Sequence, residues 1–285
     1  MTTVGMVVHG ERAQAADLAR EIAAWSLARG HRVVLPEEDA TRARLEGGVA
    51  SERLGLEADV VLSLGGDGTM LRSVDLVAAH DVPIIGINVG QLGYLTEVDP
   101  ADWERALTRW LAGEAEVDER MLLAVRVERA DGQPGPAPTI ALNEAVLEKT
   151  PMGHTVRMRV HLDGTFFTTY AADGLIVATP TGSTAYSLSA RGPIVAPRHR
   201  AVLLTPVSPH MLFDRTLVLE PTTEVCLEVC GHRPATLSVD GRNQGELTEG
   251  DRVVCTAAGH TARLITYGAR DFHQIVKAKF GLEDR

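Results

Sequence analysis

One junction constrains the fold of this chain more than any other feature. An apolar run, Val60–Leu64, leads directly into Gly65-Gly66-Asp67-Gly68-Thr69 and then into Met70-Leu71. This order predicts a strand, a tight turn and the start of a helix. Glycines permit positive φ and a close backbone approach to a ligand, and amides at a helix start can bind anionic oxygens. The junction therefore predicts a phosphate-binding loop, although Gly and Asp are also common in ordinary surface turns.

Asp67 stands in the middle of this loop, where its negative charge would repel a bound phosphate. A carboxylate is useful beside phosphate when it binds a metal ion or accepts a proton from an attacking hydroxyl group. Both situations occur in phosphoryl transfer. The residue therefore points to a kinase, provided that the loop is more than a surface turn.

The first third of the chain alternates apolar runs with helical patterns. We expect strands at residues 4–9, 31–35, 59–64 and 82–88, and helices at residues 13–29, 69–79 and 102–111. Near-continuous apolar strands joined by helices are typical of a parallel sheet covered on both faces. Residues 1–119 are thus predicted to form an α/β domain with a doubly wound parallel sheet. Ligands of such sheets bind beyond the carboxyl ends of the strands, where Asp67 falls.

From residue 120 the pattern changes to short strands separated by turns such as Asp131-Gly132 and Asp163-Gly164. We expect one helix at residues 183–190 and strands at residues 121–128, 139–148, 156–162, 165–170, 175–178, 216–219, 224–229, 236–239, 252–256 and 262–267. Residues 120–267 are therefore predicted to form a mostly β, sandwich-like second domain. Residues 268–285 have a helical pattern from Phe272 to Phe280 and are expected to pack back on the first domain.

Composition argues against two classes of partner. The chain has 285 residues and a formal net charge of -10, whereas nucleic-acid binding needs a basic surface. No apolar run approaches the length that spans a membrane, and the first residues lead directly into a strand. We therefore expect a cytoplasmic protein with no nucleic-acid or membrane partner. The three cysteines lack a paired CxxC spacing and are expected to be reduced core thiols.

Two further segments combine polar groups in unusual ways. Asp173–Ser189 predicts a strand, then a turn rich in hydroxyl groups, then a short helix, which suits binding of a polar heterocycle. Alternatively, Ser183 caps a helix and Tyr186 fills the core. The pair Asn143-Glu144 interrupts an apolar strand. Because neighbouring strand residues point to opposite faces, at least one of the two should face the interior or a ligand, unless the pair caps a strand end.

Five elements follow one another along the chain: Gly65–Thr69, Asn88–Thr96, Asn143-Glu144, Asp173–Ser189 and Ser238–Gly241. In their order and spacing these elements together resemble the bacterial NAD kinase family. The resemblance covers essentially the whole chain. Gly-Gly-Asp-Gly alone also occurs in diacylglycerol, sphingosine and phosphofructo-kinases. The run Thr-Pro-Thr-Gly-Ser-Thr-Ala-Tyr with an upstream Asn-Glu is far more specific.

The resemblance implies an enzyme that phosphorylates the 2'-hydroxyl of the adenosine ribose of NAD to give NADP, with ATP or polyphosphate as the donor. It implies that Asp67 accepts the hydroxyl proton and that the glycines of its loop shape the donor phosphate site. The resemblance also implies which residues contact the nucleotides: Gly65, Gly66, Gly68, Thr69, Arg72, Tyr94, Asn143, Glu144, His154, Ala171, Asp173, Thr184, Ala185, Tyr186, Ser187, Leu188, Ser189 and Arg242.

Within that set the resemblance assigns distinct roles. Asn143 and Glu144 would bind the adenosine ribose and base, and Asp173 would contact the nicotinamide side of NAD. The adenine pocket would be lined by Tyr94, Thr184, Ala185, Tyr186 and Ser189. Arg72 would reach phosphate, His154 would lie near the substrate, and Ala171 would contribute backbone only.

The resemblance also implies a divalent cation, Mg²⁺ or Mn²⁺, and a homodimer or homotetramer with its interface in the β domain. Three positions depart from the family pattern: Arg242 stands where Gln is usual, Arg191 where a glycine is common, and Ala171 where the residue is often larger. We predict that arginine holds part of the donor or product phosphate, since its planar fork suits bidentate contacts. Arg242→Gln is expected to change the KM for NAD or donor several-fold.

Competing functions make different demands on the sequence. A lipid kinase would need a basic or apolar membrane-facing surface, which this acidic chain lacks. A non-catalytic dinucleotide sensor would keep the adenine pocket but could dispense with Asp67. A P-loop kinase is excluded because no Gly-x-x-x-x-Gly-Lys occurs. No Gly-x-Gly-x-x-Gly follows the first predicted strand either, so dinucleotide binding has to be built differently from that of a Rossmann dehydrogenase.

Overall fold

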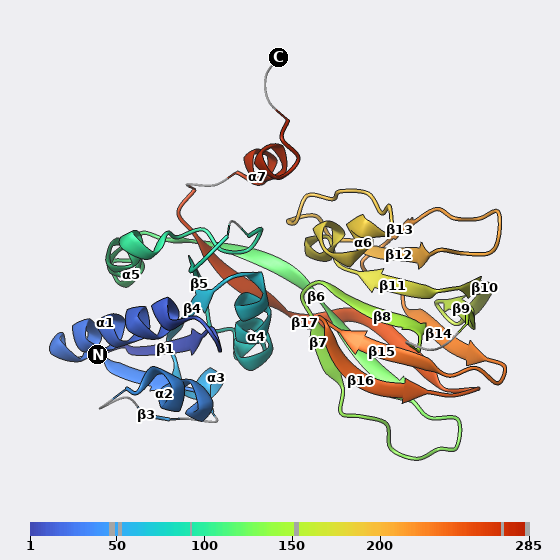
Figure 1. The fold of residues 1–285 in the computed structure, drawn as a ribbon, viewed down its shortest axis with the longest axis horizontal. Helices are drawn as coiled ribbons and strands as arrows, with labels where there is room; N and C mark the ends of the chain where they lie inside the picture. Colours follow the sequence, from blue (N-terminus) through green and yellow to red (C-terminus); the bar gives the residue numbers. More distant parts are fainter. Residues whose placement is uncertain (46–48, 51–52, 92, 151–153, 269–270, 283–285) are drawn as a thin grey trace. The chain divides into compact units, whose positions relative to one another are not determined.

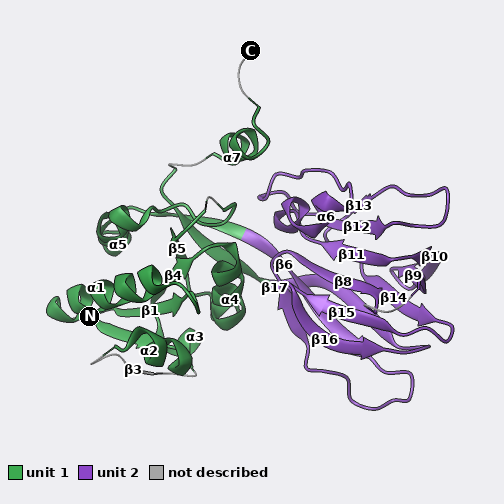
Figure 2. Cartoon of the chain, in the orientation of Figure 1, with its two compact units in different colours: residues 1–119, 260–285 green, residues 120–259 purple. Residues whose placement is uncertain are grey.

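The computed structural model describes residues 1–45, 49–50, 53–91, 93–150, 154–268 and 271–282. The chain forms two compact units, one made of residues 1–119 and 260–285 and the other of residues 120–259 (Figures 1 and 2). Each unit has its own apolar core. No helix in the described ranges is both long and apolar enough to cross a membrane.

The first unit contains a parallel sheet with the order β5-β4-β1-β2-β3. Its strands are β1 (Thr3–Val8), β2 (Arg32–Leu35), β3 (Val49–Ala50), β4 (Val60–Gly65) and β5 (Ile84–Asn88). The last part of β17 (Arg252–Thr266) joins the outer edge, where Leu264 pairs with Ile84 in parallel. The helices of the unit are α1 (Ala13–Ala28), α2 (Glu37–Ala43), α3 (Leu54–Glu57), α4 (Asp67–Val77), α5 (Trp103–Leu111) and α7 (Phe272–Lys279), with single 3₁₀ turns at Ala78–His80 and Pro100–Asp102.

Helices cover both faces of this sheet. Met6 and Ile85 point to one face and share a buried cluster with Ile22 of α1 and Leu107 of α5. On the other face, a Cβ built at Gly5 would lie 3.0 Å from Leu54 of α3, and one at Gly86 would lie 3.0 Å from Met70 of α4. The predicted doubly wound α/β arrangement is therefore confirmed.

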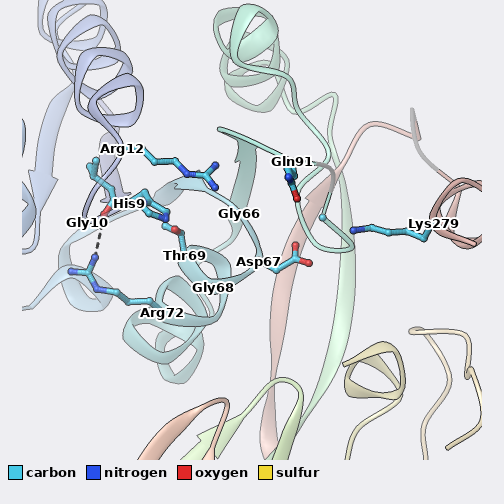
Figure 3. A pocket seen from close by; sticks show the side chains of 12 residues that line it. His9, Gly10, Arg12, Gly66, Asp67, Gly68, Thr69, Arg72, Gln91 and Lys279 are labelled. Atoms are coloured by element: carbon cyan, nitrogen blue, oxygen red, sulfur yellow. Dashed lines mark hydrogen bonds between the residues drawn. The ribbon is translucent and has the colours of Figure 1, made fainter. Parts of the chain in front are cut away.

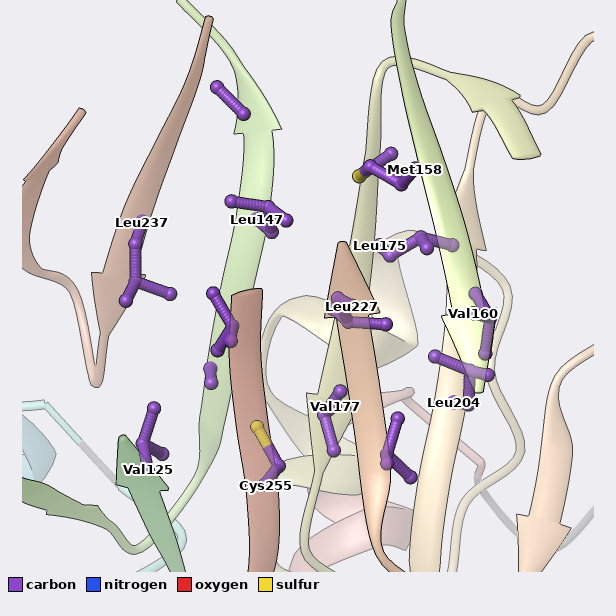
Figure 4. Close-up of a cluster of buried hydrophobic side chains, with 14 of the residues drawn as sticks. Val125, Leu147, Met158, Val160, Leu175, Val177, Leu204, Leu227, Leu237 and Cys255 are labelled. Atoms are coloured by element: carbon purple, nitrogen blue, oxygen red, sulfur yellow. The ribbon is translucent and has the colours of Figure 1, made fainter. Parts of the chain in front are cut away.

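The second unit is a β-sandwich. One sheet has the order β10-β9-β14-β17, with β6 paired to β17 and β7; the other, all antiparallel, has the order β13-β12-β11-β8-β15-β16. Its remaining strands are β6 (Glu116–Glu128), β7 (Thr139–Ala141), β8 (Glu144–Lys149), β9 (Val156–Leu162), β10 (Thr165–Ala172), β11 (Gly174–Ala178), β12 (Val202–Val207), β13 (Leu217–Leu219), β14 (Val225–Cys230), β15 (Ala235–Val239) and β16 (Arg242–Leu247). Side chains of both sheets, among them Leu147, Val177, Val160 and Leu227, form one buried cluster between them (Figure 4).

Several local predictions need correction. The single strand predicted at residues 139–148 is two strands, β7 and β8, because the backbone leaves the ladder at Leu142-Asn143. The helix predicted at residues 183–190 is a 3₁₀ turn at Thr181–Thr184 followed by the short helix α6 (Tyr186–Ser189). The sequence patterns did not predict α2, β3, α3, β12 or β16. The two strands predicted at residues 252–256 and 262–267 are one continuous strand, β17.

The terminal helix α7 forms where its pattern predicts it, and Asp271 caps it by accepting the His273 N–H. None of its residues is buried. Its predicted packing against the first domain therefore stays a prediction.

All three cysteines are free thiols. Cys255 is fully buried, and that burial raises the pKa of its thiol to about 12. Such a thiol behaves as a small apolar side chain, which agrees with the predicted core role.

Candidate functional site

The loop between β4 and α4 brings backbone amides to the carboxyl end of the parallel sheet. Gly65 is required there, because a Cβ would lie 2.1 Å from the Thr69 hydroxyl. The expected positive φ is wrong for this loop, since none of Gly65, Gly66 and Gly68 has a backbone in the left-handed region. A Cβ at Gly66 or Gly68 would instead meet no atom within 4 Å. Open space beside the backbone, rather than unusual φ, is what these two glycines provide.

Asp67 is the first residue of α4, and its carboxylate is held by a second loop. Oδ2 accepts the Tyr94 N–H at 2.9 Å, and Oδ1 accepts the Leu95 N–H at 3.0 Å. Gly93 makes this approach possible, because a Cβ there would lie 2.1 Å from Oδ1. Each carboxylate oxygen has two lone pairs, so both keep capacity for a further hydrogen bond.

A cavity of about 470 Å³ opens over this loop (Figure 3). Asp67, Gly66, Gly68 and Thr69 line it, together with Gly93 of the second loop. Besides Arg72, three basic side chains also line it: His9, Arg12 and Lys279. These three residues were not predicted from the sequence, because neither their spacing nor their local pattern distinguishes them from other surface residues.

Arg12 and Lys279 are both placed by specific contacts. The Arg12 guanidinium donates to the carbonyl oxygen of Val89, just after β5. The Lys279 ammonium group lies 5.2 Å from the centre of the Tyr94 ring. Tyr94 has a raised pKa because its hydroxyl is partly buried and because Asp67 is negatively charged. Backbone amides at a helix start and basic side chains thus gather around one carboxylate, an arrangement that is compatible with phosphoryl transfer.

Arg72 lines the same cavity but is already engaged in ion pairs. Its Nη1 lies 3.0 Å from both oxygens of the Asp39 carboxylate, and its Nη2 contacts Glu38. Asp39 is fully buried and also accepts the Val8 N–H at 2.9 Å. Arg72 therefore ties α4 to α2 and β1, and its predicted contact with phosphate stays a prediction.

The second group of candidate residues lies in the β unit, around the break between β7 and β8. The Glu144 side chain is buried, and its Oε2 has no hydrogen-bond partner within the described part of the chain. Burial, and secondly the charge of Asp240, raise the pKa of Glu144 to about 7. Asn143, which precedes it, is partly exposed. A buried carboxyl group with a free oxygen is suited to hydrogen-bonding a polar ligand.

Asp240 organises this break. Its carboxylate accepts the backbone N–H groups of Leu142, Asn143 and Glu144 at 2.7, 2.9 and 3.0 Å. Asp240 sits with Gly241 in a left-handed turn between β15 and β16, with φ of 47° and 75°. This role of Asp240 could not be predicted from the sequence, because Asp-Gly predicts only a turn.

The hydroxyl-rich segment packs directly on the same break. The Thr179 hydroxyl donates to the Leu142 carbonyl at 2.5 Å, and the Thr179 N–H donates to the Asn143 carbonyl at 2.9 Å. A Cβ at Gly182 would lie 2.2 Å from the Asn143 oxygen, so only glycine fits there. The predicted adenine loop and the Asn-Glu pair are therefore neighbours in the fold.

Within α6 and the preceding turn the side chains differ in direction. Tyr186 is 38% exposed, and its pKa is raised by partial burial and then by the nearby Glu148 and Asp173 carboxylates. Ser187 is buried and hydrogen-bonds Thr205 at 2.9 Å, so its hydroxyl faces the core. Thr184, Ala185 and Leu188 are partly exposed and Ser189 is exposed. Contacts of this segment with a nucleotide stay predictions.

The remaining predicted residues occupy the edges of this region. Asp173 pairs with Lys149 at 2.9 Å, and the Ala171 carbonyl accepts the His210 N–H at 2.8 Å. Arg242, directly after the Asp240-Gly241 turn, is exposed. Arg191 is exposed in a left-handed conformation with φ of 67°. His154 is exposed ahead of β9.

A divalent cation would find few protein ligands in the cavity. Among the described residues no group of three or more His, Cys, Asp or Glu side chains could hold a metal ion. Mg²⁺ commonly binds one or two carboxylates together with substrate phosphates. The single carboxylate Asp67 fits an ion that arrives with phosphate.

Sequence comparison identifies the two halves of the chain separately. Residues 4–115 match the family model of the ATP-NAD kinase N-terminal domain, and residues 142–267 match that of the ATP-NAD kinase C-terminal domain. The chain is 41% identical over 281 residues to an NAD kinase of Heliobacterium modesticaldum, covering 98% of both chains. It is 40% identical to an NAD kinase of Moorella thermoacetica, covering 98% of this chain and 89% of that protein.

Solved structures have the same fold. A crystal structure of yeast NADH kinase complexed with NADH matches with a TM-score of 0.90 and 24% identity, covering 100% of this chain and 89% of the other. An NAD kinase from Archaeoglobus fulgidus in complex with ATP matches with a TM-score of 0.71 and 24% identity, covering 98% and 96%. Since both domain models match in order and close relatives align over nearly the whole length, this chain belongs to the NAD kinase family of phosphotransferases.

Proposed function

We propose that this chain transfers the terminal phosphoryl group of ATP to the 2'-hydroxyl of the adenosine ribose of NAD, giving NADP. The observation that supports this most strongly is the position of Asp67, whose carboxylate lines a cavity together with open glycine backbone and basic side chains. A protein that only senses a dinucleotide does not need a carboxylate beside bound phosphate. Phosphoryl transfer to a hydroxyl group does need one.

Asp67 would act as the general base. A ribose hydroxyl is a poor nucleophile at neutral pH, so a carboxylate within hydrogen-bond reach assists by accepting its proton as it attacks phosphorus. The N–H groups of Tyr94 and Leu95 hold the Asp67 carboxylate in one orientation. This fixed orientation reduces the reorganisation needed when the hydroxyl arrives.

The donor phosphates would lie in the cavity over Gly66 and Gly68. Backbone amides at the start of α4 would bind their oxygens, and Arg12 and Lys279 would supply positive charge. A divalent cation, Mg²⁺ or Mn²⁺, would enter with the donor and neutralise phosphate charge when bound. Because the recognition is of phosphate oxygens, inorganic polyphosphate is a second candidate donor.

The β unit would bind NAD. Asn143 and Glu144 have polar groups suited to the ribose and base, and Tyr186 presents an exposed ring for stacking. Asp173 would contact the nicotinamide side, and Arg242 the phosphates. We also propose that the enzyme works in the cytoplasm as a homodimer or homotetramer through its β unit, as the family resemblance implies.

The direct test is to incubate the purified protein with NAD, Mg²⁺ and ATP and to measure NADP with an NADP-specific dehydrogenase. Parallel reactions replace ATP by polyphosphate, NAD by NADH, or Mg²⁺ by a chelator. We expect NADP that depends on both donor and metal. Tight NAD binding with no product under any of these conditions would favour the sensor and contradict the proposal.

A further inference from the structure

We propose that Asp240 is a positioning residue for NAD: its carboxylate holds the backbone of residues 142–144 so that Asn143 and Glu144 present their side chains to the nucleotide. This inference rests on the proposed function, because it deepens the role of the β unit in binding NAD. Asp240 itself need not touch the substrate.

The geometry is that of one carboxylate organising a short loop. Oδ2 accepts the Leu142 N–H at 2.7 Å, while Oδ1 accepts both the Asn143 and Glu144 N–H groups at 2.9 and 3.0 Å. The Asp240 N–H in turn donates to the Glu144 carbonyl at 3.0 Å. Four hydrogen bonds therefore connect this one residue to three successive residues, where the strand ladder is interrupted.

The loop has no substitute partners for these N–H groups in the sheet. Residues 142–143 lie between β7 and β8, and the first ladder pair of β8 with β15 is Ala145 with Val239. Without the carboxylate, three N–H donors near a buried carboxyl group would lose their acceptor. The conformation of Asn143-Glu144 thus depends on Asp240.

The opposite side of the loop is fixed by different contacts. The Thr179 N–H donates to the Asn143 carbonyl, and Gly182 lies against the same carbonyl. The loop is therefore clamped between the Asp240 turn and the turn at residues 179–182. Removal of one clamp should let the loop shift without unfolding the sandwich, because residues 142–144 are not themselves members of its buried apolar cluster.

Glu144 is the side chain most sensitive to such a shift. It is 7% exposed, and its Oε2 has no partner among the residues that the structure describes. The negative charge of Asp240 adds to burial in raising the pKa of the Glu144 carboxyl. Asp240 therefore influences Glu144 both by placing its backbone and by its charge.

Asp251 offers a matched control in the same unit. Its carboxylate accepts the Ala130 and Thr248 N–H groups, each at 2.9 Å, and pairs with Arg129 at 2.9 Å. It is 3% exposed and contacts none of the candidate NAD-binding residues through these bonds. Asp251→Asn, like Asp240→Asn, replaces one carboxylate oxygen by an NH₂ group that would face a backbone N–H donor, and so measures the purely structural effect.

The experiment compares Asp240→Asn and Asp251→Asn with the parent in the NADP-forming assay, with KM for NAD, KM for ATP, kcat and Tm measured for each. We expect Asp240→Asn to raise KM for NAD by at least tenfold while KM for ATP changes less than twofold. Asp251→Asn should lower Tm to a similar extent but leave both KM values within twofold. Asp240→Ser, which retains one small acceptor, serves if the Asn variant is insoluble.

Three results would overturn the inference. The first is an unchanged KM for NAD in a folded Asp240 variant. The second is an equal rise in KM for NAD and ATP, and the third is a rise in KM for NAD of the same size in Asp251→Asn. A parent protein that makes no NADP would instead refute the proposed function, so the two failures are distinguishable.

Discussion

The Asp67 carboxylate is anchored by the backbone of Tyr94, whose N–H donates to Oδ2 at 2.9 Å. The proposed base is therefore also the residue that connects α4 to the loop after β5. A substitution at Asp67 will act on chemistry and on this connection at the same time. The two effects have different magnitudes and can be measured separately.

Asp67→Asn should reduce kcat by about 10²- to 10⁴-fold, the usual range for loss of a general base. An amide keeps one oxygen as an acceptor, but its NH₂ group would face an N–H donor. We therefore also expect a loss of about 1–3 kcal/mol in unfolding free energy. Steady-state kinetics and thermal unfolding measure the two effects.

The control for this experiment is Asp59→Asn in the same unit. Asp59 also accepts a backbone N–H, that of Thr3 at 2.7 Å, and it does not line the cavity. The Asp59→Asn variant should be less stable than the parent but should have the same kcat at saturating substrates. If Asp67→Asn turns over within about threefold of the parent, Asp67 is a structural residue and the proposed mechanism fails.

Gly93→Ala tests whether the position of the carboxylate matters. The added Cβ would lie 2.1 Å from Asp67 Oδ1, so the carboxylate or the loop must move. Since misplacement by about 1 Å can reduce a rate by about 10²-fold, we expect kcat to fall by at least tenfold. Gly259→Ala, where a Cβ meets no atom within 4 Å, is the control and should behave as the parent. Equal activity of both variants would show that the carboxylate has freedom to move.

The sequence predicted the layout of the first unit because its strands are apolar throughout. The run at Val60–Leu64 and the glycines after it identify both a buried strand and a loop at its carboxyl end. The helices α2 and α3, of seven and four residues, and the two-residue strand β3 were missed because they are too short for a periodic pattern to show. The six-residue strands β12 and β16 were also missed, because β12 contains a proline and β16 has no alternation of apolar residues.

The sites were predicted less completely than the fold, since side-chain partners come from tertiary contacts. Arg72 was expected to reach phosphate, yet its guanidinium pairs with Asp39, which no local pattern connects to it. Arg12 and Lys279 reach the cavity from opposite ends of the chain. Asp240 looks like an ordinary turn residue until its three N–H partners are seen.

Lys279→Gln tests the proposed donor site. If the ammonium group of Lys279 binds donor phosphate, its loss should raise KM for ATP several-fold and leave KM for NAD unchanged. Lys277→Gln lies on the same helix, is not among the residues that line the cavity, and provides the control for a change in charge. The same KM for ATP in both variants would place Lys279 outside the donor site.

The pH dependence of stability provides a test of Glu144 that needs no substrate. Its pKa is about 7 in the folded protein and 4.5 in an unfolded chain, so the folded state retains a proton that the unfolded state releases. The contribution of Glu144 to unfolding free energy should therefore be fully present below pH 4.5 and decline as pH rises through about 7, by up to about 3 kcal/mol. Glu144→Gln, which stays neutral, should remove this decline.

Thermal unfolding of parent and Glu144→Gln between pH 5 and about pH 8 measures the difference directly. The stabilities of the two proteins should differ least at the acid end, where the Glu144 side chain is neutral in the folded parent, and the Gln variant should become relatively more stable as pH increases. Glu246→Gln, an exposed position on β16, is the control and should follow the parent. Parallel curves for parent and Glu144→Gln would mean that the Glu144 carboxyl is ionised in the folded protein and that a cation or a hydrogen-bond donor stabilises its charge.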